Sequence, residues 1–310
     1  MVAGGGAVSY AAGAVRSLIS NSADPIKLTI LTDSEADKAA YETMVSEIGA
    51  ADVKVVSEDR CDQLAQEFYR PFPNIRSFRK GHPCWRKITD PSLFVESGQE
   101  VIVVDPDLYF PNIFRFEATL PGRLILMRQH RHCLLPPSVV ERAFERNIAL
   151  AHHTDIGVAH HTVLPWEWLE NLIAELGGAD LPRVAHIESI IWAAIAMQIG
   201  GGYLRASDWL CWERTVPKRA LLMLGIGGPS LFRLEPLKSV KCFHASSGAK
   251  DWLLSAERRG IFRTGKVDRT SPSPLSPFVS ISAEEFKRGE RMKDTYHSLL
   301  RRLGLKDPLH

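Results

Sequence analysis

Two carboxylates one residue apart have the spacing and the position of metal ligands. Asp105 and Asp107 directly follow the apolar run 101–104, which has the composition of a buried strand. Ligands of open α/β sheets bind beyond the carboxyl ends of the strands. Neighbouring carboxylates repel each other unless a cation lies between them, and oxygen ligands suit Mg²⁺ or Mn²⁺. We therefore expect a cation that bridges the protein to a phosphorylated substrate.

The same residues also fit a simpler interpretation, since Asp-Pro-Asp is a common composition for a surface turn. In such a turn both acids would be solvated and would bind nothing. The buried strand that precedes them, and the histidine segment described below, favour the metal site.

The elements that must position these acids alternate between strand-like and helix-like segments. This alternation predicts an α/β fold with a mostly parallel central sheet flanked by helices. The expected helices are 7–20, 35–48 (with Asp33 or Ser34 as N-cap), 166–176, 187–199 and about 283–303, and the expected strands are 26–32, 53–56, 100–104, 122–127, 156–159 and 239–243.

Composition excludes several classes of protein. The net charge is only +2, so charge gives no reason to expect a nucleic-acid partner. No apolar run has the length of a membrane span. Five cysteines without a paired spacing indicate free thiols, and we expect a reducing, cytoplasmic location.

Two motifs together resemble a known family. VIVVDPD contains the aspartate-any-aspartate motif, and FHASSGAKDW supplies His244, Lys250 and Trp252 at the spacing of a second motif. The chain resembles the GT-A-fold glycosyltransferases, most closely the retaining enzymes of glycosyltransferase family 8. Gly248 is displaced by one position from the family's glycine, and Asp251 replaces its proline.

The resemblance implies a role for each matched residue. His244 would be the third ligand of Mn²⁺ or Mg²⁺ beside the two acids, and Lys250 would contact the diphosphate of a nucleotide-diphosphate sugar. Gly248 and Trp252 would complete the donor-binding segment. The family further implies a UDP-sugar donor, retention of anomeric configuration, and a carbohydrate, lipid or protein acceptor.

Weaker matches extend the resemblance. The N-terminal segment resembles the family's opening, in which a first strand, here around residues 1–3 and near the nucleotide base, leads to a helix and then to a strand ending in Thr-Asp, which places Asp33 at the donor site. The segment WRK places Arg86 near the donor. HTDIGVAHH has Asp155 where the family has asparagine, and HIESIIWAAIA offers Glu188 at the start of a helix. By resemblance, these two acids would orient the sugar or the acceptor.

The resemblance covers residues 1–265 as one catalytic domain. A Ser/Pro-rich segment, 266–280, has the composition of a linker, and 281–310 forms a basic amphipathic helix. That helix is either a solvated face packed on the domain or a peripheral contact with the inner face of an anionic membrane.

Two other functions remain open at this stage. A haloacid-dehalogenase-type phosphatase also ends a strand in Asp-x-Asp, but there the motif ends the first strand of the chain. The departures at Asp155 and Asp251 also fit a degenerate domain that binds nucleotide-sugar without turnover.

Overall fold

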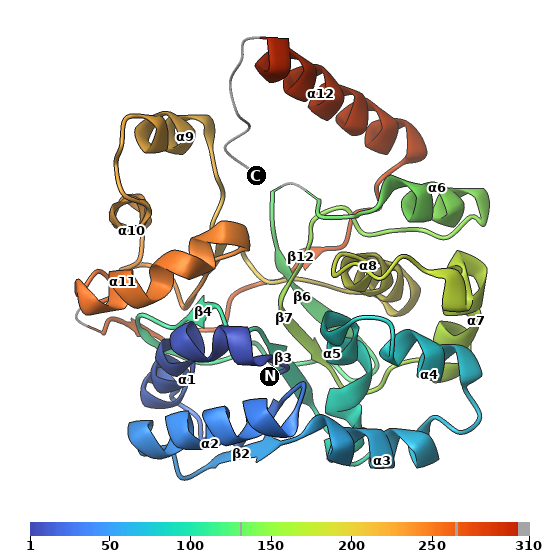
Figure 1. Cartoon of the computed structure of the whole chain (residues 1–310), viewed down its shortest axis with the longest axis horizontal. Coiled ribbons are helices and arrows are strands. Elements are labelled where there is room, and N and C mark those ends of the chain that lie inside the picture. Colours follow the sequence, from blue (N-terminus) through green and yellow to red (C-terminus); the bar gives the residue numbers. More distant parts are fainter. Residues whose placement is uncertain (131, 264–265, 303–310) are drawn as a thin grey trace.

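The computed structural model describes residues 1–130, 132–263 and 266–302 and has the expected α/β composition (Figure 1). Its helices are α1 Val8–Asn21, α2 Glu35–Ile48, α3 Glu58–Phe68, α4 Pro73–Arg79, α5 Arg86–Thr89, α6 Pro137–Glu145, α7 Trp166–Leu176, α8 Ile187–Ile199, α9 Val216–Met223, α10 Gly228–Leu231, α11 Leu253–Arg258 and α12 Ala283–Arg302. Its strands are β1 Leu28–Leu31, β2 Val53–Val56, β3 Val101–Val104, β4 Leu108–Tyr109, β5 Ile113–Phe114, β6 Leu124–Arg128, β7 Thr154–His161, β8 Gly201–Tyr203, β9 Trp209–Cys211, β10 Cys242–His244, β11 Asp268–Arg269 and β12 Ser276–Pro277.

The central sheet has five strands in the order β12-β8-β6-β7-β3 and helices on both faces (Figure 1). Alternate residues of one strand enter different cores, because side chains alternate across a strand. Val101 and Val103 of β3 belong to the core beneath α4–α8, whereas Val104 belongs to the core shared with α1 and β1. The strand that carries the acids is thus covered on both sides.

The expectation of a mostly parallel sheet is wrong. β7 runs antiparallel to both of its neighbours, β3 and β6, and only β6 and β8 pair in parallel within the five-stranded sheet. The reason lies in the connection from β6 to β7. Arg128 at the end of β6 pairs with Thr154 at the start of β7, so the segment containing α6 returns to the same end of the sheet and reverses the chain.

The N-terminal segment lies beside β1. The amide of Ala3 donates to the carbonyl of Leu31, and the amide of Leu31 donates to the carbonyl of Met1. Helix α2 begins and ends as expected because both ends are capped. The Ser34 hydroxyl accepts from the amide of Asp37, and Gly49 adopts the left-handed conformation with φ of 66°.

The Ser/Pro-rich segment expected to be a linker lies along the domain. β11 pairs with β5, and β12 forms the edge of the central sheet beside β8. Two backbone hydrogen bonds then fix the chain at the start of α12: His152 N–H to Val279 and Ile281 N–H to Leu150. The expected helix end at residue 303 lies outside the described residues. In the part of the chain that is described, no helix is long and apolar enough to cross a bilayer.

Candidate metal and donor site

Three strands bring the two acids and His244 together. Asp105 directly follows β3, and Asp107 immediately precedes β4. β10 pairs antiparallel with β4, which sets His244 opposite Leu108, and the amide of Ala245 donates to the carbonyl of Asp107. The sheet β4-β10-β9 therefore delivers a histidine from late in the chain to the end of β3.

The three side chains have the geometry of a cation site. Ligand atoms of Asp105, Asp107 and His244 all lie within 4.8 Å of one another. His244 Nε2 is 3.3 Å from Asp107 Oδ1. The Oδ1 atoms of both aspartates are buried, and a cationic side chain lies close to each: Lys87 Nζ is 2.6 Å from Asp105 Oδ1, and His244 Nε2 lies beside Asp107 Oδ1. Two carboxylates and one imidazole with spare oxygen lone pairs fit a hard divalent cation.

Asp155 orients the imidazole from the other side. Its Oδ2 lies 2.8 Å from His244 Nδ1, and both side chains are buried. A carboxylate on one ring nitrogen leaves the other nitrogen directed at the two acids, the arrangement usual for histidine metal ligands. The structure therefore places Asp155 against His244, and its Oδ2 is hydrogen-bonded to the imidazole.

An irregularity in β7 makes this contact possible. The register between β6 and β7 shifts after Leu126, and the carbonyl of Gly157 in the shifted stretch accepts from the amide of Asp105. A Cβ on Gly157 would lie 2.6 Å from His244 Nδ1, closer than a real Cβ contact. Glycine is needed there because the imidazole lies directly against the backbone.

The charges of this group depend on one another. Burial would lower the pKa of His244, but the carboxylates of Asp155 and Asp107 outweigh it and raise that pKa well above its ordinary value. Burial alone would raise the pKa of Asp155. The positive charge of His244 and its hydrogen bond outweigh burial, so the pKa of Asp155 lies below its ordinary value. Protonated His244 can thus supply the positive charge that balances the carboxylates of Asp107 and Asp155 when no cation is bound.

Lys87 is a site residue that the sequence reasoning missed. Its Nζ lies 2.6 Å from Asp105 Oδ1 and 3.4 Å from Glu188 Oε2. Burial disfavours the ammonium, but the two carboxylates outweigh it and raise the pKa of Lys87 well above its usual value. The only signal in the sequence is its place next to Arg86 in the segment WRK.

Glu188 reaches the site through Lys87. It is fully buried in the first turn of α8, where Trp192 Nε1 donates to its Oε1 over 3.3 Å. Burial raises the pKa of Glu188 to about 8, despite the nearby lysine. Its Oε2 is buried and lies beside Lys87 Nζ. A buried carboxyl with a strongly raised pKa next to a candidate cation site has the properties of a group that contacts a ligand.

Arg86 points away from this cluster. Its Nε lies 2.9 Å from Asp90 Oδ2, its Nη1 is 3.2 Å from Asp33 Oδ1, and its Nη2 donates to the carbonyl of Thr32. Only 2% of Arg86 is exposed. Arg86 is thus paired with Asp33, which is partly exposed. Burial raises the pKa of the Asp33 carboxyl.

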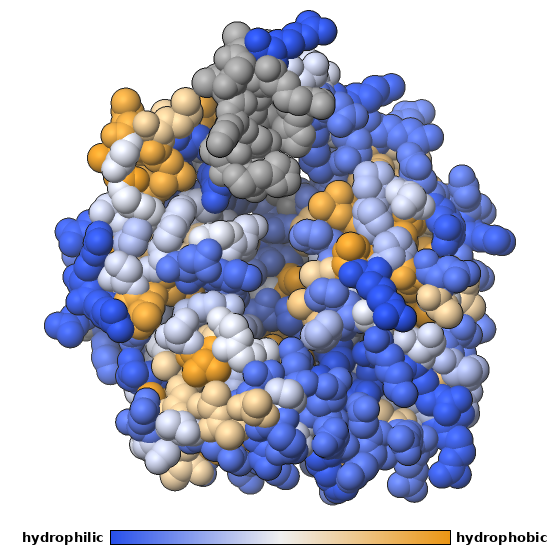
Figure 2. Space-filling view, in the orientation of Figure 1, coloured by the Kyte–Doolittle hydropathy of each residue, from blue (hydrophilic) through white to orange (hydrophobic). Residues whose placement is uncertain are grey.

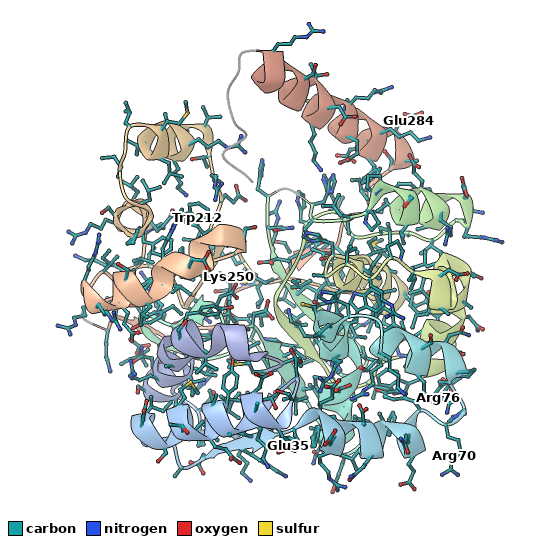
Figure 3. The ribbon with its side chains drawn as sticks, in the orientation of Figure 1. Glu35, Arg70, Arg76, Trp212, Lys250 and Glu284 are labelled. Atoms are coloured by element: carbon teal, nitrogen blue, oxygen red, sulfur yellow. The ribbon has the colours of Figure 1, made fainter. Side chains whose placement is uncertain are left out.

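The remaining predicted donor residues lie on the segment Ser247–Trp252, which forms a 3₁₀ helix. Lys250 is exposed, and Figure 3 shows it beside α11 on the same side of the molecule as Trp212. A Cβ on Gly248 would lie 3.5 Å from the side chain of Arg214. Trp252 packs edge-on against Trp212 at 5.4 Å, so it anchors this segment to a small aromatic core.

The space-filling view has a hollow in the middle of the displayed face. It separates the part of the molecule that carries α9–α11 from the part that carries α6–α8 (Figure 2).

A second group of possible ligands shares His244. Asp155, Cys211 and His244 also lie within 4.8 Å of one another. Burial raises the pKa of the Cys211 thiol to about 12, so the thiol stays protonated and is a poor ligand at neutral pH. The oxygen-rich group with Asp105 and Asp107 is therefore the better cation site.

No protein-family model matches the chain, and no curated protein matches it in sequence. Two solved structures are similar in fold. Mouse xyloside xylosyltransferase 1, in its apo form, is 13% identical with a TM-score of 0.49, over 78% of this chain and 93% of that one. The galactosyltransferase LgtC, in complex with donor and acceptor sugar analogs, is 14% identical with a TM-score of 0.44, over 88% and 96%.

Proposed function

We propose that this chain is a metal-dependent glycosyltransferase of the GT-A type that takes its sugar from a nucleotide-diphosphate sugar. The observation that carries the proposal is the convergence of Asp105, Asp107 and His244, whose ligand atoms lie within 4.8 Å of one another at the ends of β3 and β10. The family resemblance adds UDP as the nucleotide and retention as the stereochemical outcome.

Each residue has a defined task in this proposal. Asp105, Asp107 and His244 would hold Mn²⁺ or Mg²⁺, which when bound supplies positive charge to the departing diphosphate. Asp155 keeps His244 Nε2 directed at the two acids and is a positioning residue. Exposed Lys250 would bring its ammonium to the diphosphate, where negative charge develops as the bond to the sugar breaks.

Lys87 and Glu188 form the part of the site that we assign to the sugar. Lys87 links Asp105 to Glu188, so a ligand held at Asp105 would lie near the pair of Lys87 and Glu188. That carboxyl is suited to accept or donate a hydrogen bond to a sugar hydroxyl, because its pKa of about 8 lies close to neutrality.

Calorimetric titration of UDP and GDP, with and without Mn²⁺, tests the proposal. We expect one nucleotide to bind only when Mn²⁺ is present, and Asp107→Ala to abolish that binding. Asp59→Ala, which removes an exposed acid from α3, is the matched control and should bind as the wild type does. If neither nucleotide binds in the presence of the metal, the transferase proposal is wrong.

Hydrolysis of the donor separates a transferase from a domain that binds nucleotide-sugar without turnover. We expect slow, Mn²⁺-dependent release of free sugar from a UDP-sugar, since water can replace the acceptor. Tight metal-dependent binding of UDP without any release of sugar would instead identify a binding domain.

A further inference from the structure

Helix α9 and the loop after it, residues 216–226, have apolar side chains on the surface. No residue of α9 is buried. Val216 is 75% exposed, Met223 68% and Leu224 78%, and the neighbouring Ile226 and Leu234 are also exposed. Scattered single apolar residues on a surface are normal, but several large ones exposed on one short helix and the segments beside it mark an interaction site. We call these five residues the α9 patch.

An ion pair ties α9 to the protein. Lys218 Nζ lies 2.6 Å from Glu235 Oε1 and donates to the carbonyl of Glu213 over 2.9 Å. The same ammonium lies 5.3 Å from the centre of the Trp212 ring. Leu221 and Leu222 are half-buried like Lys218, whereas the α9 residues of the patch are exposed.

The patch lies on a protrusion. Figure 1 shows α9 at the end of two chain segments that extend from the part of the molecule containing α10 and α11. Figure 2 shows apolar surface at the same place. A convex element of eight helical residues presents little area to a flat protein surface, whereas a stable interface needs about 800 Å² from each partner.

The charge around the patch is positive. Residues 213–238 contain five basic side chains and two acidic ones, an excess of three positive charges. Arg233 and Lys238 are exposed, and one of the two acids, Glu235, is paired with Lys218. The ion pair of Lys218 with Glu235 places the segment that carries Arg233 and Lys238 beside α9. Exposed apolar side chains with basic ones nearby are complementary to an anionic lipid surface.

We propose that the α9 patch docks this protein onto an anionic lipid bilayer. The apolar side chains enter the boundary between headgroups and acyl chains, and the basic residues contact lipid phosphates. The C-terminal helix α12 is also basic. Among its side chains that the structure describes, Met292 is the exposed large apolar one and Phe286 is buried in the main core, so this part of the helix exposes less apolar surface than α9.

Docking through α9 would hold the candidate site close to the lipid headgroups. The amide of Trp212, at the base of the protrusion, donates to the carbonyl of His244 over 2.8 Å. This geometric relation holds whether or not the chain transfers a sugar, so the docking proposal is independent of the proposed function.

Sedimentation of the full chain with sucrose-loaded vesicles tests the proposal. The vesicles are made of phosphatidylcholine, either alone or with phosphatidylglycerol. We expect the wild type to sediment with the anionic vesicles and much less with the neutral ones. The double variant Met223→Ser/Leu224→Ser should bind the anionic vesicles at least about tenfold more weakly, because two side chains lose their transfer into the apolar phase.

The matched control is Met292→Ser on α12, since Met292 and Met223 are both 68% exposed. This variant should bind vesicles as the wild type does. All the substituted residues are exposed, so the thermal unfolding curves of the variants should coincide with that of the wild type. A large fall in melting temperature is checked by repeating the assay with Arg233→Gln/Lys238→Gln, which should weaken binding to anionic vesicles alone.

Three results would overturn the proposal. The first is no binding of the wild type to anionic vesicles at low salt. The second is loss of binding in Met292→Ser but not in the α9 variant, which would assign the contact to α12. The third is a wild-type dimer in light scattering that the α9 variant converts to a monomer, which would make a second copy of the chain the occupant of the patch.

Discussion

Arg86 and Lys87 are neighbours on α5, yet they enter two buried charge clusters of different kinds. Arg86 and Arg79 share the carboxylate of Asp90, which is fully buried and bonded through both of its oxygens. Lys87 lies between Asp105 and Glu188, and Asp105 belongs to the candidate cation site with Asp107 and His244.

The difference indicates what each cluster does. A buried charge whose hydrogen-bonding capacity is fully used has nothing left for a ligand, and such a network fixes structure. The second cluster has four carboxyl groups, those of Asp105, Asp107, Asp155 and Glu188, around two cationic side chains, so it has negative charge to spare for a bound cation. The first cluster therefore supports the site, because it holds Asp33 and α5 in place, and the second is the site itself.

The largest expected effect comes from a substitution that breaks the cluster around Asp90. Asp90→Ala leaves Arg79 and Arg86 buried without their shared carboxylate, which should cost about 3–5 kcal/mol of stability, measured by urea unfolding. Asp62→Ala is the matched control, because Asp62 is the partly exposed partner of the same Arg79 and should cost about 1 kcal/mol or less. Equal losses for the two variants would show that burial does not distinguish the two acids.

A change on the ligand-binding side should affect metal affinity with little effect on folding. Gly157→Ala forces the His244 imidazole away from its place, and we expect about a 10–100-fold loss of Mn²⁺ affinity, measured by calorimetry with UDP present. Gly227→Ala is the control, since no atom lies within 4 Å of the Cβ it would add. Unchanged affinity in Gly157→Ala would mean that His244 is not a ligand.

The third expected effect is a dependence of stability on pH. Burial raises the pKa of Glu188 to about 8, well above the value of an unfolded chain near 4.5. A raised pKa contributes stability that is complete below about pH 4.5 and is lost as the pH rises through about 8. Without divalent cations, the melting temperature of the wild type should therefore fall more steeply over this range than that of Glu188→Gln.

Glu47→Gln provides the control for that titration, because Glu47 is exposed on α2 and its variant should keep the wild-type slope. Parallel curves for the wild type and Glu188→Gln would mean that Glu188 titrates normally, and the proposed contact with the sugar would lose its basis.

Local signals in the sequence determined much of the fold. Helices α2, α7 and α8 have the bounds that capping residues and terminal glycines predict, because these signals act within a few residues of the helix ends. The short strand β2 also has its predicted bounds. The prediction that Asp105, Asp107 and His244 belong together depended on recognising motifs, and the structure brings the three side chains together.

Only the tertiary structure decided the rest. The direction of β7 depends on how its connection to β6 returns to the sheet, which no local pattern encodes. The choice of Lys87 over Arg86 as the neighbour of Asp105 depends on which side of one short helix faces β3, and both residues are basic. The contact of Asp155 with His244 joins residues far apart in the chain through a shifted register. Sequence determines which residues can bind a cation, whereas the packing of distant segments determines which of them meet.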